Sequence, residues 1–367
     1  MLQRRQFNLA TTAALGGWAG WSGCTPATGA GSYEQAVADT WRHGPPDASA
    51  GGGLQRELVR YATLAPSSHN TQCWKFRLGE AGIDILPDLS RRCPAVDPDD
   101  HHLFVSLGCA AENLVQAALA HGLRSEVGFD ADSQAVRVRF EPTRPVATPL
   151  FQAIPERQCT RGDYDGQPLT PGELALLQQA GSGPGVQLLL MTERAAMERT
   201  LDFVLQGNTA QMKEPAFVDE LKAWIRFSGS DAARTGDGLY AASSGNPSLP
   251  AWLGRPLFGL FFTTASENDK VARQLRSAAG IAVFSGDAAD AAHWVEVGRC
   301  YERFALQAAA LGVRNAMLNQ PVEVAALRTP FAGAIGLGAR RPDLLLRFGR
   351  GPKLPPSLRR PVQAVMI

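Results

Sequence analysis

The sequence lacks an excess of charge of either sign, and charged residues are few overall. Its 367 residues include 36 Lys and Arg against 35 Asp and Glu, which leaves a formal net charge of +1. A chain without a basic surplus has no general electrostatic attraction for nucleic acid, so no nucleic-acid partner is expected. Because 45% of the residues are hydrophobic and only 19% are charged, a mainly disordered protein is excluded as well. The length predicts about two domains.

Metal-type cysteine spacing is also missing. The six cysteines are Cys24, Cys73, Cys93, Cys109, Cys159 and Cys300, and none of them forms a CxxC pair. Their spacing indicates neither a disulfide framework nor a zinc site. Residues 97–102 (DPDDHH) contain carboxylates and imidazoles, but acidic residues suit the start of a helix, so we expect a polar N-terminal turn there and no metal.

Long hydrophobic runs are absent apart from one mildly apolar stretch at the N-terminus. Residues 1–24 combine RRQF at 4–7 with a Gly- and Ala-rich segment that ends in SGC at 22–24. This resembles a twin-arginine export signal whose end resembles a lipobox. We therefore expect the export machinery as a partner, a periplasmic location and membrane attachment through a lipidated Cys24. Trp21 departs from the usual lipobox, so lipidation stays open, and the basic N-terminus of a cytoplasmic protein is the alternative.

An internal repeat organises the rest of the chain. Residues 25–53 are rich in Gly, Ala, Ser, Thr and Pro and predict a flexible linker. Beyond it, VSLGCAAE at 105–112 matches VEVGRCYE at 295–302, and both segments continue as Ala-rich helices that end at Gly122 and Gly312. Two buried central helices imply two similar lobes, over residues 54–150 and 151–367. A chance likeness of two Ala-rich helices is the alternative.

Strand-like runs surround each of these helices. They lie at 74–78, 83–86 and 135–140 in the first half and at 185–190, 281–284 and 344–348 in the second. Small sheets wrapped by helices predict an α+β fold.

The segment 65–74 reads APSSHNTQCW. Pro66 ends a helix, and the residues after it place hydroxyls and an amide on a tight turn, which suits an ordinary loop or a polar ligand. The run resembles the signature A-P-S-S-x-N-x-Q-P-W of the nitroreductase-like FMN-dependent superfamily, from which Cys73 departs. That resemblance implies that Pro66, Ser67, Ser68 and Asn70 bind the cofactor FMN.

A second superfamily motif, Arg-x-Ser-x-Arg, binds the ribityl phosphate. RQCTR at 157–161 resembles it and implies cofactor contacts from Arg157, Gln158, Cys159 and Arg161. Each half of the chain carries only one of the two motifs, whereas the ordinary family builds its FMN site at a homodimer interface. The resemblance, nearest to the two-lobed Acg-like branch, thus implies a nitroreductase-like fold in which one chain forms a monomeric pseudo-dimer with one FMN.

Two further segments of the second lobe resemble family motifs. The tail LPPSLRRP at 354–361 resembles a terminal basic motif that pairs with the FMN phosphate, which implies contacts from Arg359 and Arg360. A solvated basic tail is the alternative. The loop MLNQP at 317–321 falls where the family places backbone near the flavin N5 edge, which implies roles for Asn319 and Gln320.

The resemblance implies an oxidoreductase that passes electrons from NAD(P)H or another donor through FMN to a nitro or quinone acceptor. Flavin supplies the redox chemistry, so no catalytic side chain is assigned. Residues 202–256 form a long insertion that suits a lid, which leaves an FMN-sequestering protein with an occluded flavin and little turnover as one alternative. A flavin-free exported scaffold or binding lipoprotein is the other. Cys73 and Cys159 replace family residues in the two motifs, which raises the hypothesis of a thiol pair beside the flavin.

Overall fold

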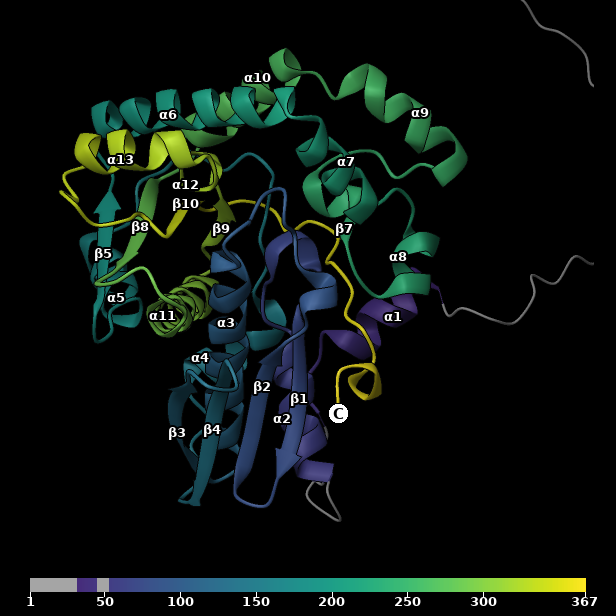
Figure 1. Ribbon diagram of the computed structural model, residues 1–367, viewed down its shortest axis with the longest axis vertical. Coiled ribbons are helices and arrows are strands. Elements are labelled where there is room, and N and C mark those ends of the chain that lie inside the picture. The colour runs from purple at the N-terminus through teal and green to yellow at the C-terminus, as the bar shows by residue number, and fades with distance from the viewer. Residues whose placement is uncertain (1–31, 45–52) are drawn as a thin grey trace, which may run out of the picture.

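The computed structural model describes residues 32–44 and 53–367. The described part consists of two lobes, each with a four-stranded antiparallel sheet packed on a long helix (Figure 1). The predicted α+β class with two similar lobes is therefore confirmed. The export signal and lipobox predicted over residues 1–24 lie outside the described residues.

The first lobe is built around helix α3 (His101–Ala120). Its sheet has the order β1-β2-β4-β3, formed by β1 (Trp74–Gly79), β2 (Gly82–Pro87), β3 (Leu123–Asp130) and β4 (Ala135–Pro142). Phe76, Ile85 and Val136 lie opposite one another on neighbouring strands and are fully buried in the core shared with α3 and α2 (Gly53–Thr63). The residues between them are more exposed, as expected of an antiparallel sheet with one solvated face.

The second lobe repeats this topology. Its sheet has the order β5-β8-β10-β9, formed by β5 (Val186–Met191), β8 (Gly280–Gly286), β9 (Arg314–Met317) and β10 (Leu344–Gly349), and its long helix is α11 (Ala291–Ala310). Helix α5 (Pro171–Ala180) precedes the sheet, as α2 does in the first lobe. Every residue of β8 and β10 is buried, because helices cover both faces of this sheet. The lobes thus share strand order and helix position.

The lobes meet where α3 crosses α11, at the two glycines of the internal repeat. A Cβ on Gly108 would lie 2.0 Å from the carbonyl oxygen of Val295, and a Cβ on Gly298 would lie 2.0 Å from that of Val105. Only glycine permits so close a backbone approach. Helix α3 is long and apolar enough to cross a membrane, but 83% of its most apolar window is buried inside the protein, as in the core helix of a globular fold.

The second lobe differs from the first by a long segment between β5 and β8, which we call the excursion (residues 192–279). The first lobe has only a tight turn, residues 80–81, at the equivalent place. The excursion contains α6 (Arg194–Lys213), α7 (Pro215–Trp224), β6 (Ile225–Arg226), α8 (Gly229–Thr235), β7 (Leu239–Tyr240), the short helix η4 (Ala241–Ser244), α9 (Ala251–Phe261) and α10 (Thr264–Arg276). Helices α6 and α10 cover the second sheet, whereas α7 and α8 reach toward the first lobe (Figure 1).

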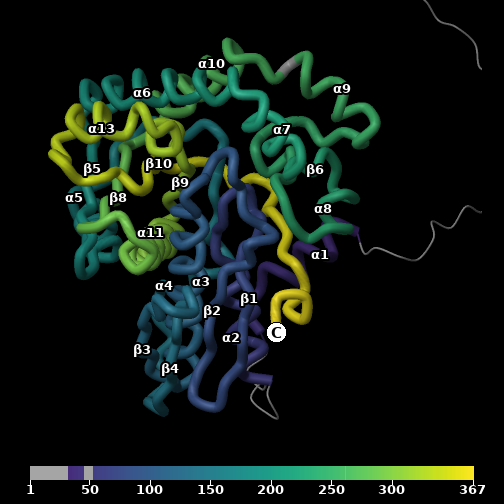
Figure 2. Tube along the Cα trace, viewed as in Figure 1, coloured from purple at the N-terminus to yellow at the C-terminus, as the bar shows by residue number. Residues whose placement is uncertain are grey.

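Two chain segments cross from one lobe to the other. After α4 (Pro149–Ala153) and η3 (Ile154–Glu156), the amide of Thr160 donates to the carbonyl of Asn315 at the edge of the second sheet (2.8 Å). Helices α12 (Gln320–Glu323) and α13 (Ala325–Ala334) lie between β9 and β10. At the other end, the C-terminal segment returns from β10 to the first lobe (Figure 2). There the amide of Phe76 in β1 donates to the carbonyl of Val365 (2.8 Å).

Part of the predicted linker is ordered. Within residues 25–53 the structure describes helix α1 (Tyr33–Thr40), which Ser32 caps through the amide of Gln35. The Tyr33 hydroxyl donates to the carbonyl of Pro356 (2.6 Å), and Trp41 Nε1 donates to that of Ser357 (2.9 Å). The linker prediction needs correction for residues 32–44, because composition does not reveal that two aromatic side chains anchor this segment to the C-terminal tail.

Candidate functional site

A cavity between the two lobes is the candidate functional site. The loop after α2, the facing sides of α3 and α11, residues 157–161 and the C-terminal segment form its wall. Ten of the twelve predicted cofactor-binding residues line it, namely Pro66, Ser67, Ser68, Asn70, Arg157, Gln158, Cys159, Arg161, Asn319 and Arg359. The fold therefore brings residues of both predicted half-sites to one place.

The loop 66–72 is held in a rarely used backbone conformation. His69, Asn70 and Gln72 have φ values of 47°, 53° and 55°, in the left-handed region that residues other than glycine seldom occupy. Asn70 Nδ2 donates to carbonyls of the excursion and of the C-terminal segment (2.9 and 3.1 Å), and its Oδ1 accepts from Arg359 (2.9 Å). The Asn70 amide thus joins three segments and has no free donor for a ligand.

Arg359 lines the cavity but fixes the loop instead of offering free donors. Its guanidinium donates to the carbonyls of Thr63 (2.7 Å), Leu64 (3.1 Å) and Ala65 (3.1 Å), at the C-terminal end of α2. A positive group at this end stabilises the helix dipole. Burial, with a smaller contribution from the charge of Arg157, lowers the pKa of Arg359 to about 9.

Arg157 and Glu302 form a buried ion pair beside the cavity. Arg157 Nε lies 3.2 Å from Glu302 Oε1, and the side chains are 3% and 0% exposed. Arg157 also donates to the carbonyl of Leu64 (2.6 Å). Burial raises the pKa of Glu302 to about 7, although Arg157 opposes the shift. Two buried guanidiniums, those of Arg157 and Arg359, thus face one carboxylate that holds its charge weakly, so this end of the cavity is electropositive.

Arg161 is the cation in this cavity that is available to a ligand. Its backbone carbonyl accepts from Gln274 Nε2 (2.6 Å), but within residues 32–44 and 53–367 its guanidinium has neither a hydrogen bond nor an ion pair. Its charge reaches the neighbouring groups, since it helps to lower the pKa of His69. A guanidinium without a partner, in a cavity that two buried guanidiniums also line, favours an anionic group, phosphate above all.

Gln158 and Cys159 position neighbouring segments. Both ends of the Gln158 amide bond the backbone of Leu354, as donor to its carbonyl (2.5 Å) and acceptor from its amide (2.9 Å). Cys159 bridges to β9. The described cysteines are all free, and Cys73 does not line the cavity. The structure therefore does not form the hypothesised pair of Cys73 and Cys159, because Cys73 points into the core of the first lobe.

Two predicted residues lie away from the cavity wall. Gln320 begins α12 and packs on Gly207 of α6. Arg360 faces the other side of the tail from Arg359, because successive residues of an extended chain point in opposite directions. There its side chain donates to the carbonyl of Ala364 (3.0 Å) and lies 4.0 Å from Asp88.

The motifs did not reveal several residues of the wall. The excursion contributes Leu239, Ser243 and Ser244, and the long helices contribute His102, Val105, Ser106, Cys109 and Tyr301. Ser243 Oγ is buried without a hydrogen-bond partner among the described residues. The repeat match at 105–112 marked the helix but not the side that faces the cavity, and nothing local marked the serines of the excursion.

The polar start of α3 has the structural role that the sequence predicted. Asp97 accepts from the amides of His102 and Leu103 (both 3.0 Å) and so caps the helix. His102 then lies in the cavity wall, with Nδ1 3.9 Å from Oε1 of Glu323. Burial raises the pKa of Glu323, so this carboxyl keeps its proton to higher pH than an exposed one.

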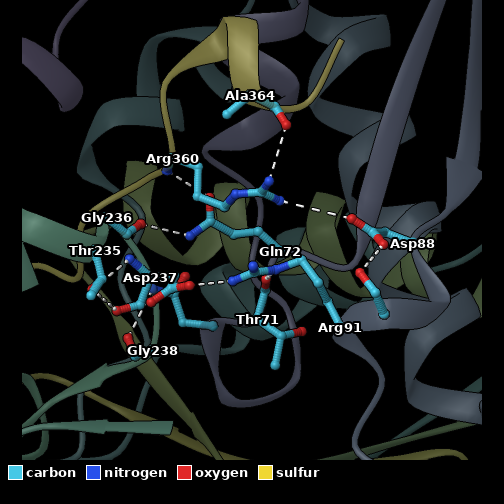
Figure 3. A network of polar contacts seen from close by, with 12 residues as sticks. Thr71, Gln72, Asp88, Arg91, Thr235, Gly236, Asp237, Gly238, Arg360 and Ala364 are labelled. Atoms are coloured by element: carbon cyan, nitrogen blue, oxygen red, sulfur yellow. Dashed lines mark hydrogen bonds and ion pairs between the residues drawn. The ribbon is translucent and has the colours of Figure 1, made fainter. Parts of the chain in front are cut away.

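A network of polar contacts fastens the excursion to the loop and to the tail (Figure 3). Gln72 Nε2 donates to the carbonyl of Gly236 (2.8 Å), while its Oε1 accepts from the amide of Arg360 (2.8 Å). Asp237 pairs with Arg91 of the first lobe and with Arg226 of the excursion. Burial opposes the ionisation of Asp237, but hydrogen bonds from the two arginines outweigh it and lower the pKa. The excursion, which contains the predicted lid, is therefore bonded to the loop and to the tail at its turn 235–238.

The chain was compared with family models, with solved structures and with curated proteins. No family model matches the chain. Among solved structures, "a putative nitroreductase" from Anabaena variabilis has a TM-score of 0.42 at 11% identity over 86% of this chain and 91% of that one. A nitroreductase with bound FMN from Desulfitobacterium hafniense has a TM-score of 0.39 at 15% identity over 59% of this chain and 96% of that one.

Two curated proteins of Mycobacterium tuberculosis, from strains CDC 1551 and H37Rv, carry the name "Putative NAD(P)H nitroreductase" and are each 26% identical over 324 residues. The match covers 85% of this chain and 90% of each relative, so it includes both lobes. The chain resembles nitroreductases over most of its length. With the two lobes of like topology, this similarity supports the nitroreductase-like fold that the sequence predicts.

Proposed function

We propose that the protein is an FMN-dependent oxidoreductase of the nitroreductase type and that its two lobes act as a pseudo-dimer around one flavin. The observation that carries this proposal is that Ser67 and Ser68 of the first lobe line the same cavity as Arg161, whose guanidinium has no partner among the described residues. Because each lobe supplies only one half of the site, one flavin per chain is expected.

The cavity suits the three chemical parts of FMN. The guanidiniums that line it, Arg161 above all, suit the phosphate. Hydroxyls, including the unpartnered Ser243 Oγ, suit the ribityl chain. Val105, Leu239 and Leu344 supply an apolar wall for the planar ring. When bound, FMN supplies the electron transfer, so the protein needs to contribute position, charge and access.

The proposed electron donor is NAD(P)H, because the curated relatives are named as NAD(P)H nitroreductases. A nitro or quinone compound is the proposed acceptor. Periplasmic export, lipidation of Cys24 and the export machinery as partner are also part of the proposal, and they rest on residues 1–24. The periplasm is poor in NAD(P)H, so export favours another electron donor.

A second function, FMN binding or sequestration with little turnover, is favoured by the fastened excursion. Residues 235–238 are bonded to the loop and to the tail, and η4 lines the cavity. An excursion that stays closed would admit no acceptor. If the protein is instead a flavin-free scaffold, the purified chain carries no bound chromophore.

The deciding measurement is the absorbance spectrum of the purified mature chain, with the ratio of flavin to protein after heat release. A ratio near one supports the composite site. Two flavins contradict the complementary half-sites, and none even after FMN addition favours the scaffold. Oxidation of NAD(P)H by the flavin-loaded protein then separates the reductase from the sequestering protein.

Arg161→Ala is the sharpest variant for this site. We expect FMN affinity to fall at least tenfold, because a charge-assisted contact with phosphate is lost. Arg144→Ala, at an exposed loop arginine outside the cavity, is the matched control and should retain FMN as the wild type does. Equal retention of FMN by both variants would contradict the composite-site model. Arg157→Ala is a poorer probe, because it leaves Glu302 buried without its partner.

A further inference from the structure

We propose that His69, Cys93 and Glu220 bind a zinc ion that joins the excursion to the first lobe beside the cavity. The three side chains come from the loop after α2, the loop before α3 and α7 of the excursion. One ligand atom from each lies within 4.8 Å of the other two. Thiolate, imidazole and carboxylate are the donors that zinc uses in proteins.

The geometry needs only a small adjustment. A tetrahedral zinc about 2.0–2.3 Å from each ligand holds the ligand atoms roughly 3.3–3.8 Å apart. Side-chain rotations that move the ligand atoms by about an ångström close the difference. Three protein ligands leave the fourth position of the zinc for water or another ligand. His69 also lines the cavity, so the site borders it.

Neighbouring groups already orient the donors. Both oxygens of Glu220 accept backbone amides of the loop that carries Cys93, from Ala95 (2.9 Å) and Val96 (3.2 Å). Such bonds hold a metal-binding carboxylate in place. His69 Nδ1 is buried with no hydrogen-bond partner among the described residues. Burial of polar atoms without partners is costly, and a ligand that uses the imidazole relieves that cost.

The protonation states are compatible with binding. Burial, and then the charges of Arg161 and His102, lower the pKa of His69 to about 4, so its imidazole is neutral at pH 7 and offers a lone pair. Burial, and then the charge of Glu220, raise the pKa of Cys93. Zinc binding must therefore displace the thiol proton: one Zn–S bond forms, one S–H bond breaks, and the proton leaves to solvent.

The other cluster of this kind in the described residues is less suitable. Asp97, His101 and His102 also lie within 4.8 Å of one another, but this set offers no thiolate, and His101 Nε2 already lies 3.1 Å from Asp343 Oδ1.

The test uses the full chain stripped with chelator, with Co²⁺ as a spectroscopic probe. We expect one equivalent of Co²⁺ per chain, a thiolate-to-cobalt charge-transfer band in the difference spectrum, and displacement of the band by Zn²⁺. Cys93→Ser should lose the band, whereas Cys300→Ser, at another buried cysteine, should keep it. Absence of the band from the wild type, or its persistence in Cys93→Ser, would overturn the proposal.

A second variant tests the site without a change at the buried cysteine, where a substitution could impair folding. Glu220→Gln keeps the shape of a partly exposed side chain and should weaken Zn²⁺ binding at least tenfold. Its zinc content after dialysis should fall below that of the wild type, and Zn²⁺ should raise the Tm of the wild type more than that of the variant. Equal zinc content and equal Tm shifts would contradict the site. None of these readouts depends on flavin.

Discussion

Burial couples the protonation of Glu302 to the stability of the protein near neutral pH. Its side chain is 0% exposed beside Arg157, and its pKa rises from 4.5 to about 7. Between these values the folded state keeps a proton that the unfolded state has released. The stability that this proton contributes is complete below pH 4.5 and is lost as the pH rises through about 7.

The prediction at this scale is that Glu302→Gln flattens the dependence of stability on pH. The amide does not titrate, so the free energy of unfolding should fall less between pH 4.5 and 7.5 in the variant than in the wild type. Urea unfolding at both pH values measures the difference. Asp343, whose pKa burial raises to about 6, titrates in both proteins and leaves a common slope. Identical pH profiles would refute the role of Glu302.

At the scale of elements, the crossing of α3 and α11 determines how the lobes meet. Glycines stand at the two contact points, and each faces a backbone carbonyl of the other helix. Their equivalent positions in the repeat make the contact symmetric. The helices can approach this closely only while both positions lack a side chain.

We therefore expect Gly108→Ala to destabilise the protein by about 1–3 kcal/mol, because the added methyl forces the helices apart. Gly259→Ala in the exposed helix α9 is the control: no atom lies within 4 Å of its added Cβ, and alanine should stabilise the helix by about 0.5–1 kcal/mol. Chemical denaturation of both variants checks the signs. A neutral Gly108→Ala would show that the crossing tolerates a side chain.

At the scale of the whole molecule, the excursion decides access to the cavity. It is an insertion in the second lobe, yet its turn 235–238 is bonded to the loop of the first lobe and to the C-terminal tail. Asp237 is central, because it pairs with Arg91 of the first lobe (Figure 3) and with Arg226 of the excursion.

The corresponding prediction is that Asp237→Ala loosens the excursion. Loss of charge-assisted hydrogen bonds worth about 1.5 kcal/mol should increase proteolysis within residues 213–264 about tenfold. It should also speed the release of bound flavin. Asp219→Ala, at an exposed position of α7, serves as the comparison. Equal cleavage rates would mean that the pairs of Asp237 do not hold the excursion.

The local sequence determined much of the fold. The repeat at 105–112 and 295–302 identified the two central helices in their register. Apolar runs identified six strands, β1, β2, β4, β5, β8 and β10, at or near their observed positions. Pro66 marked the end of α2, and the motifs named ten residues of the cavity wall. These signals succeed because helix periodicity, turn chemistry and motif spacing are local properties of the chain.

Only the tertiary structure decided how the named residues are used. Arg359 and Arg161 have the same side chain, but Arg359 caps α2, while the guanidinium of Arg161 lines the cavity without a partner in the part of the chain that the structure describes. Ser243 of the excursion and His102 of α3 line the same wall although they lie far apart in the sequence. Burial, the partner of each donor and the meeting of distant segments arise from long-range packing, and such packing leaves no mark in the neighbouring residues.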